Sequence, residues 1–508
     1  MEKHYWKIFS AVVIIKLVLA YSFPITSDEA YYYTWGQYLD VNYYDHPPVT
    51  GWIVYLFYLF GRHIFFSRLF SSITGIIVAI GIYLVAKEIS RDENKARLVS
   101  LVYLVVPWNF IVLISSDVPL FLFVFLSGVF FYYGINMKRS SLVLVSGIFL
   151  SLAILSKYFA GLLLIAFCGY LILRPNRNSI KYGLILILGT LPLLLLHLYW
   201  NYTDCWTTLM FNVFNRNKDH SLKVGTFLKF VLFQIILSTP WMLYFVARNL
   251  KFIRAGIKRD NNLFFHLFII PVSILGMLAF FDTSLHWTIS FYPFLFILLV
   301  YLDSAQLALI IKFSGIFSLM LVLIIAIILT LPVETFKNHR YYRDIVMGFY
   351  GNEIYEKIKK YEDQYVFGTP GYTTAALMTY HSGKHFIVFM DDDRNGRNDD
   401  KLTDFKALDG RNILILSTLK VKAKEYQDYQ NYFKRLVIDT LSVRQANYTL
   451  IFGDGFQYEK YRDTYLSKIL LDCYDIPGFL PIGDCFFFNR YFPERNRQHS
   501  VDRHLESE

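Results

Sequence analysis

The sequence predicts a polytopic α-helical membrane protein with a small α/β domain at its C-terminus. Of its 508 residues, 55% are hydrophobic and only 18% are charged, and the mean hydropathy is positive at +0.37. Apolar runs recur between residues 8 and 330, whereas the chain turns polar after Pro332. Soluble globular proteins do not combine these features. We therefore expect a membrane domain, residues 1–332, and a second domain, residues 338–508.

Eleven apolar runs approach the length of about 20 residues that a helix needs to cross a bilayer. The expected spans lie near 8–25, 66–86, 98–115, 118–136, 141–156, 158–173, 182–199, 227–247, 263–281, 287–302 and 307–330. No small-residue cleavage site follows the first run, so we expect a retained helix rather than a cleaved signal peptide.

Topology explains the net charge of +10 better than nucleic-acid binding does. Lys and Arg cluster between apolar runs, at 87–97, 138–139, 174–181 and 248–259, as the positive-inside rule requires of cytoplasmic loops. With the N-terminus inside, the outer face carries residues 28–62, 115–117, 157, 200–225 and 282–286. An odd number of spans also leaves the C-terminal domain outside.

The C-terminal domain alternates short β-like runs with helical patterns, which is typical of an α/β fold. We expect strands at 365–367, 386–389, 412–416, 449–452 and 485–488, and helices at 354–361 and 426–437.

The first outer loop is the most informative segment of the chain. Residues 28–48 read DEAYYYTWGQYLDVNYYDHPP and directly follow the first apolar run. Carboxylates at a membrane surface are costly, which makes Asp28 and Glu29 candidates for a functional site. A simpler explanation is that Ser27 or Asp28 caps an interfacial helix over 31–39.

A helix cap requires one acid rather than two, and capping does not explain the later Asp45-His46-Pro47-Pro48. Acids at the mouth of a membrane site serve well as general bases. We therefore interpret Asp28 as a candidate catalytic residue.

Three further polar residues are expected on the same face. Asp117 is either the N-cap of a helix with Pro119 in its first turn or a second functional acid. Lys157 is either a snorkelling side chain or a partner for a phosphate. His286 is either a passive interfacial residue or another donor of the same kind. Lys157 and His286, together with His46 and the nearby Arg62 and Arg68, form a group of donors that would suit a phosphate leaving group.

Two other features favour structural interpretations. Cys473 and Cys485 would pair if their region faces an oxidising compartment, and would stay free otherwise. Met390 is followed by DDDRNGRNDD, which matches the first half of a calcium-binding EF-hand loop. Leu402 replaces the acid that the twelfth position needs, so we expect a solvated turn.

The first loop resembles that of bacterial GT-C-type glycosyltransferases, the relatives of protein O-mannosyltransferases and of the lipid A aminoarabinose transferase. The likeness rests mainly on Asp-Glu-Ala-Tyr-Tyr and Tyr-Tyr-Asp-His-Pro-Pro. It extends to Ser116-Asp117, Ser156-Lys157 and His286-Trp287, and to residues 368–381 and 408–416.

This resemblance implies catalytic roles for three acids. Asp28 would take the proton from the acceptor hydroxyl, and Glu29 would position the loop or the acceptor. Asp117 would orient the acceptor or the sugar. Tyr44 and Asp45 would contact the substrate.

The resemblance also implies a phosphate-binding group. The aminoarabinose transferase has Lys before its Pro-Pro pair, contacting the lipid phosphate. This chain has His46 there, which weakens that contact unless the imidazole is protonated. Lys157 and His286 would then share the phosphate.

The implied reaction transfers a sugar from a polyprenyl-phosphate donor, with inversion, at the bacterial inner membrane. Lipid A or another lipopolysaccharide component is the expected acceptor, and a protein hydroxyl or a polysaccharide is the alternative. The residues do not identify the sugar. No Gly-rich phosphate cradle suggests a nucleotide donor. No cofactor is required; a divalent metal near Asp28 and Asp117 stays open, although no ligand spacing demands one.

Two other classes of function stay open. A proton-coupled transporter or lipid flippase would use the acids as relays, but transporters usually contain inverted repeats, and the sequence has no internal repeat. A non-enzymatic scaffold that binds envelope glycans leaves the Asp28 segment unexplained.

Overall fold

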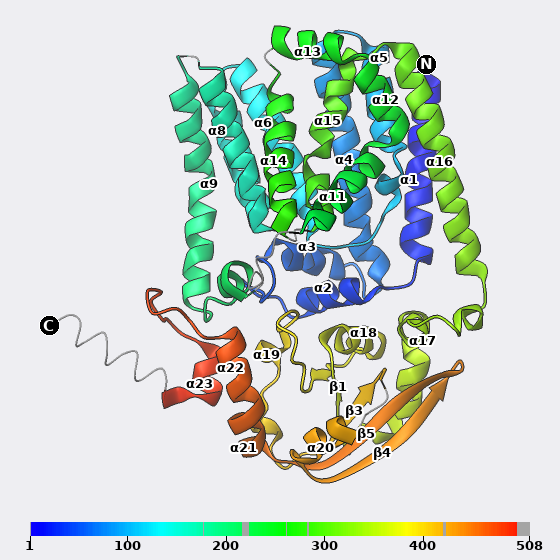
Figure 1. Cartoon of the computed structure of the whole chain (residues 1–508), viewed down its shortest axis with the longest axis vertical. Helices are drawn as coiled ribbons and strands as arrows, with labels where there is room; N and C mark the ends of the chain where they lie inside the picture. The colour runs from blue at the N-terminus through cyan, green and yellow to red at the C-terminus, as the bar shows by residue number, and fades with distance from the viewer. Residues whose placement is uncertain are drawn as a thin grey trace, which may run out of the picture. The chain divides into compact units, whose positions relative to one another are not determined.

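The computed structural model describes residues 2–175, 177–215, 223–260, 262–281, 284–419 and 423–494. The chain forms two compact units, each assembled from separate stretches (Figure 1). The first unit contains Met1–Phe23, Leu56–Leu196 and Asp219–Thr330, and the second contains Pro24–Tyr55, His197–Lys218 and Leu331–Glu508. The second unit is thus larger than the expected domain at 338–508, because it also includes the first loop. Of the expected outer elements, residues 216–222 and 282–283 lie outside the described residues.

Helices build the first unit. They are α1 (Glu2–Ser22), α4 (Ile64–Ser90), α5 (Glu93–Leu104), α6 (Asp117–Asn136), α7 (Ser140–Ile154), α8 (Gly161–Leu173), α9 (Ser179–Tyr202), α11 (Val224–Ser238), α12 (Pro240–Arg248), α13 (Leu250–Arg259), α14 (Leu263–Leu278), α15 (Tyr292–Leu298) and α16 (Ser304–Thr330). Six helical segments of the described chain are long and apolar enough to cross a membrane, or seven if α11 and α12, which meet at 85°, form one broken span. The chain is therefore a multi-pass membrane protein.

The described helices do not confirm the expected count of eleven spans. The expected span at 98–115 is wrong in extent, because α5 ends at Leu104 and Pro107 starts a short 3-10 turn instead of continuing the helix. Shorter apolar helices occupy three other expected positions, at Ser140–Ile154, Tyr158–Leu173 and Leu285–Tyr301. Proline and 3-10 turns divide apolar runs that composition alone presents as continuous.

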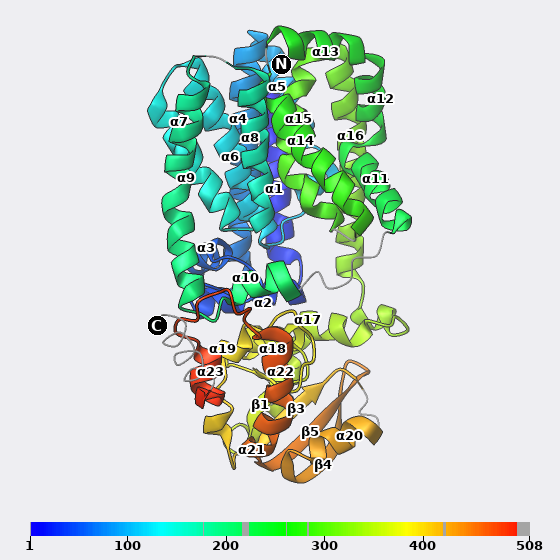
Figure 2. The ribbon, with the colours of Figure 1, turned by 60° about the vertical axis from the view of Figure 1, so that its left-hand side comes forward.

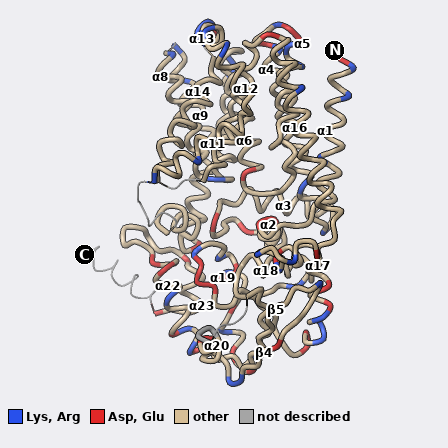
Figure 3. The backbone as a smooth tube through the Cα atoms, turned by 45° about the vertical axis from the view of Figure 1, so that its right-hand side comes forward, with Lys and Arg blue, Asp and Glu red and all other residues tan. Residues whose placement is uncertain are grey.

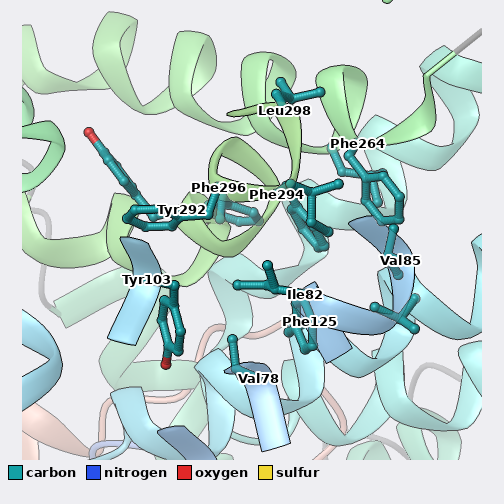
Figure 4. Close-up of a cluster of buried hydrophobic side chains, with 14 of the residues drawn as sticks. Val78, Ile82, Val85, Tyr103, Phe125, Phe264, Tyr292, Phe294, Phe296 and Leu298 are labelled. Carbon is teal, nitrogen blue, oxygen red and sulfur yellow. The ribbon is translucent and has the colours of Figure 1, made fainter. Parts of the chain in front are cut away.

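Close packing between helices holds the first unit together. Aromatic and aliphatic side chains from α4, α6, α14 and α15 fill its core (Figure 4). Gly147 on α7 and Gly189 on α9 let two helix backbones approach each other, since a Cβ atom on either would lie 2.4 Å from a carbonyl oxygen of the other helix. Small residues at such contacts are a common packing device in membranes, where no hydrophobic force draws helices together.

Basic residues gather at the end of the first unit that carries α13 (Figure 3). This helix exposes Lys251, Arg254 and Lys258, and buries Ile253 and Gly256. The grouping agrees with the charge pattern from which the sequence predicts a cytoplasmic end.

The second unit contains a mixed five-stranded sheet with the order β2-β1-β3-β5-β4. Figure 2 labels β1, β3, β5 and β4. Its strands are β1 (Val366–Thr369), β2 (Ile387–Val388), β3 (Ile413–Ser417), β4 (Phe433–Val443) and β5 (Ala446–Phe456). β1 is parallel to β2 and β3, whereas β5 is antiparallel to β3 and β4.

The second unit also contains helices and turns. They include α2 (Ser27–Gln37), α3 (Val49–Tyr58), α10 (Thr207–Leu209), α17 (Tyr342–Ile358), α18 (Tyr372–Ser382), α19 (Asp399–Leu402), α20 (Ala423–Gln430), α21 (Tyr458–Tyr461), α22 (Ser467–Cys473) and α23 (Phe486–Tyr491). Two sequence expectations are wrong here. The helix expected at 426–437 ends at Gln430 and gives way to β4, and the strand expected at 485–488 is the start of α23.

A disulfide joins Cys205 to Cys485, across 280 residues of sequence. The pairing of Cys473 with Cys485 suggested by their spacing is therefore wrong, and Cys473 is a buried free thiol. Sequence proximity favours the nearer cysteine, whereas the fold brings Cys205 to Cys485 at the start of α23 within the second unit.

Candidate functional site

The first turn of α2 assigns different tasks to Asp28 and Glu29. Thr26, rather than Ser27 or Asp28, is the N-cap, and its Oγ1 accepts a hydrogen bond from the Glu29 N–H. The Glu29 carboxylate accepts in return from the Thr26 N–H at 3.2 Å, which completes a capping box. Glu29 is 1% exposed, whereas Asp28 is an exposed residue. The cap therefore uses the second acid and leaves the first on the surface of the helix.

Asp28 lines a polar cavity of about 150 Å³ in the second unit. The cavity is bounded by carboxylates, aromatic rings, an imidazole and an amide: Asp28, Tyr31, Tyr32, Asp45, His46, Phe211, Tyr372 and Asn395. All three stretches of chain that build the unit contribute to it. Pockets with aromatic walls and a few convergent polar groups are typical ligand sites.

Asp45 is a buried anchor in the wall of this cavity. Its Oδ2 accepts a hydrogen bond from the Tyr31 hydroxyl at 2.5 Å, and its Oδ1 accepts from the Gly396 N–H at 3.0 Å. Burial and the Asp45 charge raise the pKa of Tyr31 well above its ordinary value, so this hydroxyl stays protonated and keeps donating. The family resemblance implies that Asp45 contacts the substrate, but both of its carboxylate oxygens are hydrogen-bonded to groups of the protein itself.

Only the first half of the DDDRNGRNDD segment agrees with the solvated turn that the sequence predicts, with Asp392, Asp393 and Asn395 exposed. Residues 396–400 are buried. Arg397 donates from Nε and Nη2 to the two oxygens of Asp400, at 2.7 and 2.9 Å, and from Nη1 to the carbonyls of Asp391 and Asp393. Tyr474 donates to Asp400 at 2.9 Å. A buried ion pair with this many hydrogen bonds fixes the loop.

Lys401 ties the first loop to the same segment. Its ammonium donates to the Asn42 carbonyl at 2.9 Å and to Asp204 at 3.0 Å, and it also pairs with Asp40. Burial raises the pKa of Asp204, against the opposing effect of Lys401. Segments from residues 40–46, 204–212 and 391–401 therefore form one hydrogen-bonded assembly beside the cavity.

Tyr44 does not line the cavity. Its side chain is 1% exposed and packs against the rings of Phe211 and Tyr474, with centroids 5.3 and 6.1 Å away. This position favours a packing role over the substrate contact that the family resemblance implies.

The first unit holds a second polar cluster. Lys157 Nζ lies 2.7 Å from Asp117 Oδ1, and His286 Nε2 lies 3.6 Å from Asp117 Oδ2. Asp117 is the first residue of α6, but Ser116 is the N-cap, so the expected capping role of Asp117 is wrong. The rings of Phe159 and Trp287, which follow Lys157 and His286 in sequence, stack with centroids 4.8 Å apart. The structure thus brings Asp117, Lys157 and His286 together.

The two groups of predicted residues belong to different units. Asp28, Asp45 and His46 line the cavity of the second unit, Glu29 lies in the helix cap beside it, and the Asp117 cluster is in the first unit. Among the described residues, no three His, Cys, Asp or Glu side chains are grouped so that they would hold a metal ion.

Sequence reasoning names neither Tyr31 nor Tyr32 of the first loop as a site residue. It also misses three cavity residues outside that loop, Phe211, Tyr372 and Asn395. A signal was present for two of them. Tyr372 lies in the 368–381 segment that carries the family resemblance, and Asn395 lies in the acidic segment with the calcium-like spacing. Neither pattern reveals that these segments meet the first loop.

Comparison with known proteins yields one family model, described as dolichyl-phosphate-mannose-protein mannosyltransferase, which matches residues 45–200. A lipid A galacturonosyltransferase, RgtD of Rhizobium johnstonii, is 29% identical over 188 residues, or 36% of this chain and 39% of the relative. An uncharacterised protein of Aquifex aeolicus is 33% identical over 162 residues, or 30% of this chain and 32% of the relative. The matches span less than half of either relative's length.

Solved structures extend the likeness to most of the chain. The crystal structure of ArnT from Cupriavidus metallidurans bound to undecaprenyl phosphate superposes with a TM-score of 0.64, covering 89% of this chain and 98% of ArnT at 13% identity. The apo form gives a TM-score of 0.61 at 12% identity. The predicted resemblance is confirmed at this level: the chain has the fold of the GT-C-type membrane glycosyltransferases.

Proposed function

We propose that the chain transfers a sugar from a polyprenyl-phosphate donor to an acceptor of the bacterial envelope. Its likeness to a family of protein mannosyltransferases, to a lipid A galacturonosyltransferase and to ArnT supports this class of reaction. One observation carries the proposal. The Asp28 carboxylate lines a polar cavity, while the adjacent acid closes the helix cap.

Asp28 is the general base in this proposal. It takes the proton of an acceptor hydroxyl as the hydroxyl oxygen attacks the anomeric carbon of the donor sugar. The glycosidic bond forms as the bond from that carbon to the phosphate oxygen breaks, so the configuration inverts and polyprenyl phosphate leaves with the electron pair. A positioned base contributes about 10²–10⁴-fold in rate. Glu29 acts indirectly, because its capping box fixes the turn that carries Asp28.

Cationic side chains offset the charge on the departing phosphate. We assign this role to Lys157 and His286, and Asp117 positions both of them. His46, which lines the Asp28 cavity, adds a third cation when it is protonated.

Lipid A, or another lipopolysaccharide component, is the acceptor that we propose. The name of the RgtD relative supports lipid A, and the description of the family model supports a protein hydroxyl as the alternative. We place the second unit outside the cytoplasm, in a protein of the bacterial inner membrane. Disulfides persist in oxidising compartments, and Cys205–Cys485 lies in this unit.

A transfer assay in membranes tests the proposal. Radiolabelled undecaprenyl-phosphate sugars, bearing a hexuronate, a pentose, an amino sugar or a hexose, are incubated with extracted lipid A, envelope protein and polysaccharide. Wild type is compared with Asp28→Asn and with Asp363→Asn, a matched change at an exposed carboxylate outside the cavity. We expect label in lipid A with wild type and Asp363→Asn, and a loss of at least 100-fold with Asp28→Asn.

Each outcome of this assay has a defined meaning. Label in protein or polysaccharide replaces the acceptor and keeps the mechanism. Normal transfer by folded Asp28→Asn removes the proposed base. An absence of transfer from every donor by folded wild type rejects the reaction class.

A further inference from the structure

Part of the wall of the Asp28 cavity comes from the C-terminal part of the chain and not from the first loop. Tyr372 starts α18, and Asn395 stands in the acidic segment before Gly396. The Tyr372 ring packs edge-on against Tyr31, with centroids 5.0 Å apart. These two residues have no role in the proposed proton transfer, so that step does not explain why they line the cavity.

Hydrogen bonds fix the geometry of this part of the cavity wall. The Tyr372 N–H donates to Asp391 Oδ2 at 3.2 Å, and the Asn395 side chain donates to Asp393 Oδ1 at 2.8 Å. Arg397 Nη1 donates to the carbonyl oxygens of Asp391 and Asp393. Gly396 has a φ of +71°, and a Cβ atom there would lie 2.1 Å from the Tyr372 ring, so only glycine allows this approach.

The chemistry of the lining favours a sugar. Four aromatic rings line the cavity, those of Tyr31, Tyr32, Phe211 and Tyr372, and aromatic rings provide apolar surface against which the C–H groups of a pyranose or furanose ring can pack. Asp28 accepts hydrogen bonds, and the amide of Asn395 both donates and accepts, which matches hydroxyl groups. Burial raises the pKa of the Tyr372 phenol, so this hydroxyl remains a donor.

The size of the cavity agrees with a small ligand. Its volume of about 150 Å³ is roughly ten times the 10–15 Å³ that one water molecule requires. A single sugar ring suits this space better than an ordered water or an ion does.

We infer that Tyr372 and Asn395 form a sugar-hydroxyl-binding subsite beside Asp28, through which the C-terminal part of the chain selects a substrate. This inference rests on the proposed function. The ring that it binds belongs either to the polyprenyl-phosphate donor or to a sugar-bearing acceptor such as lipid A. The hydroxyl contacts are the same in both cases, and kinetics distinguish the two sources.

Steady-state transfer by the full chain in proteoliposomes tests the subsite. The KM for undecaprenyl-phosphate sugar and the KM for lipid A are each measured at saturation of the other substrate, for wild type, Asn395→Ala and Tyr372→Phe. Asp392→Ala is the matched control, because Asp392 is exposed in the same segment and pairs with Lys468. We expect each of the two cavity variants to raise one KM by about two- to tenfold, the size of a net hydrogen bond, with kcat nearly unchanged.

The affected substrate identifies the source of the ring: a rise in the donor KM assigns the donor sugar, and a rise in the acceptor KM assigns lipid A. If both KM values stay within error of wild type in both cavity variants, the subsite is rejected while the transfer reaction stands. If Asp392→Ala raises KM equally, the effect belongs to the loop as a whole and the subsite is likewise rejected.

A binding measurement keeps the inference separate from the proposed reaction. Equilibrium binding of radiolabelled undecaprenyl-phosphate sugar and of radiolabelled lipid A is compared between Asp28→Asn and Asp28→Asn/Asn395→Ala. Weaker binding of one ligand by the double variant supports the subsite even if wild type shows no transfer. If the two variants bind each of the two ligands with equal affinity, the subsite is rejected.

Discussion

Asp28 in the second unit and Asp117 in the first both stand in the first turn of a helix, yet their carboxylates have different neighbours. Asp28 is exposed in a cavity lined by aromatic and polar side chains. Asp117 Oδ1 lies 2.7 Å from the Lys157 ammonium, and Oδ2 lies 3.6 Å from His286. Sequence position alone made both acids catalytic candidates.

The difference agrees with the two roles that we propose, a base for Asp28 and a counter-ion for Asp117. A base has to meet the hydroxyl that it deprotonates, which the Asp28 cavity permits. The ion pair of Asp117 instead fixes the direction of a lysine, and a fixed cation is what a leaving phosphate needs. Substitutions that remove each charge while preserving the shape of the side chain test whether the two acids differ in this way.

The largest expected effect comes from making the same change at two adjacent acids. Asp28→Asn removes the proposed base and should lower the transfer rate by about 10²–10⁴-fold. Glu29→Gln should retain most activity, because glutamine also closes a capping box. Initial transfer rates and melting temperatures of both variants provide the measurement. If Glu29→Gln is as inactive as Asp28→Asn, Asp28 is not established as the base and Glu29 takes that role.

The next largest effect concerns stability. Arg397→Ala leaves Asp400 as an unpaired buried carboxylate and releases two carbonyl groups of the cavity wall, which should cost about 3–5 kcal/mol. Arg394→Ala in the same segment removes a pair with Asp472 in which both side chains are 37% exposed, and should cost less than about 1 kcal/mol. Thermal unfolding in detergent compares the two. Equal losses would mean that the Arg397 network does not support the unit.

Sequence reasoning succeeded where information is local. The long apolar runs of α4, α6 and α16 predict spans directly, and Asp28, Asp45 and His46 lie within 18 residues of one another, so their meeting in one cavity follows from one loop. Pro107 shows the limit of this reasoning, since an apolar window does not register a helix break.

The remainder of the site depends on contacts between distant segments. Asp45 meets Gly396 across 351 residues, and Cys205 pairs with a cysteine 280 residues away. The composition of the acidic segment does not distinguish a solvated turn from a loop fixed by a buried ion pair. The difference depends on the hydrogen bonds that Arg397 makes in the folded chain. Tyr372 and Asn395 were missed for the same reason.

The ion pair of the first unit should show a smaller, measurable coupling. A double-mutant cycle combines Asp117→Asn with Lys157→Met, and we expect an interaction free energy of about 0.5–3 kcal/mol in stability. The cycle between Asp117→Asn and His286→Gln should give less than about 1 kcal/mol, since His286 is 47% exposed and lies farther away. Additive effects in the first cycle would mean that Asp117 does not hold Lys157.

The smallest expected effect uses a second His–Asp pair, in the second unit, as a contrast to His286 and Asp117. His385 Nε2 lies 2.9 Å from Asp399 Oδ1, beside Thr403. Burial lowers the pKa of His385, but the hydrogen bond and charge of Asp399 outweigh burial and raise that pKa above its ordinary value. A raised pKa in the folded state stabilises the protein below about pH 6.5, the unfolded value, and this contribution is lost as the pH rises through the folded pKa.

Melting temperatures between pH 6 and pH 9 test this sign. Wild type should lose no more than a few degrees as the pH rises, and His385→Gln should lack that dependence and be less stable at the acidic end. His339→Gln, at an exposed histidine of the same unit, serves as the control and should follow wild type. A pH dependence that survives in His385→Gln would assign it to another group. A dependence of the opposite sign would mean that burial outweighs Asp399, so that this pair resembles a buried neutral histidine more than an ion pair.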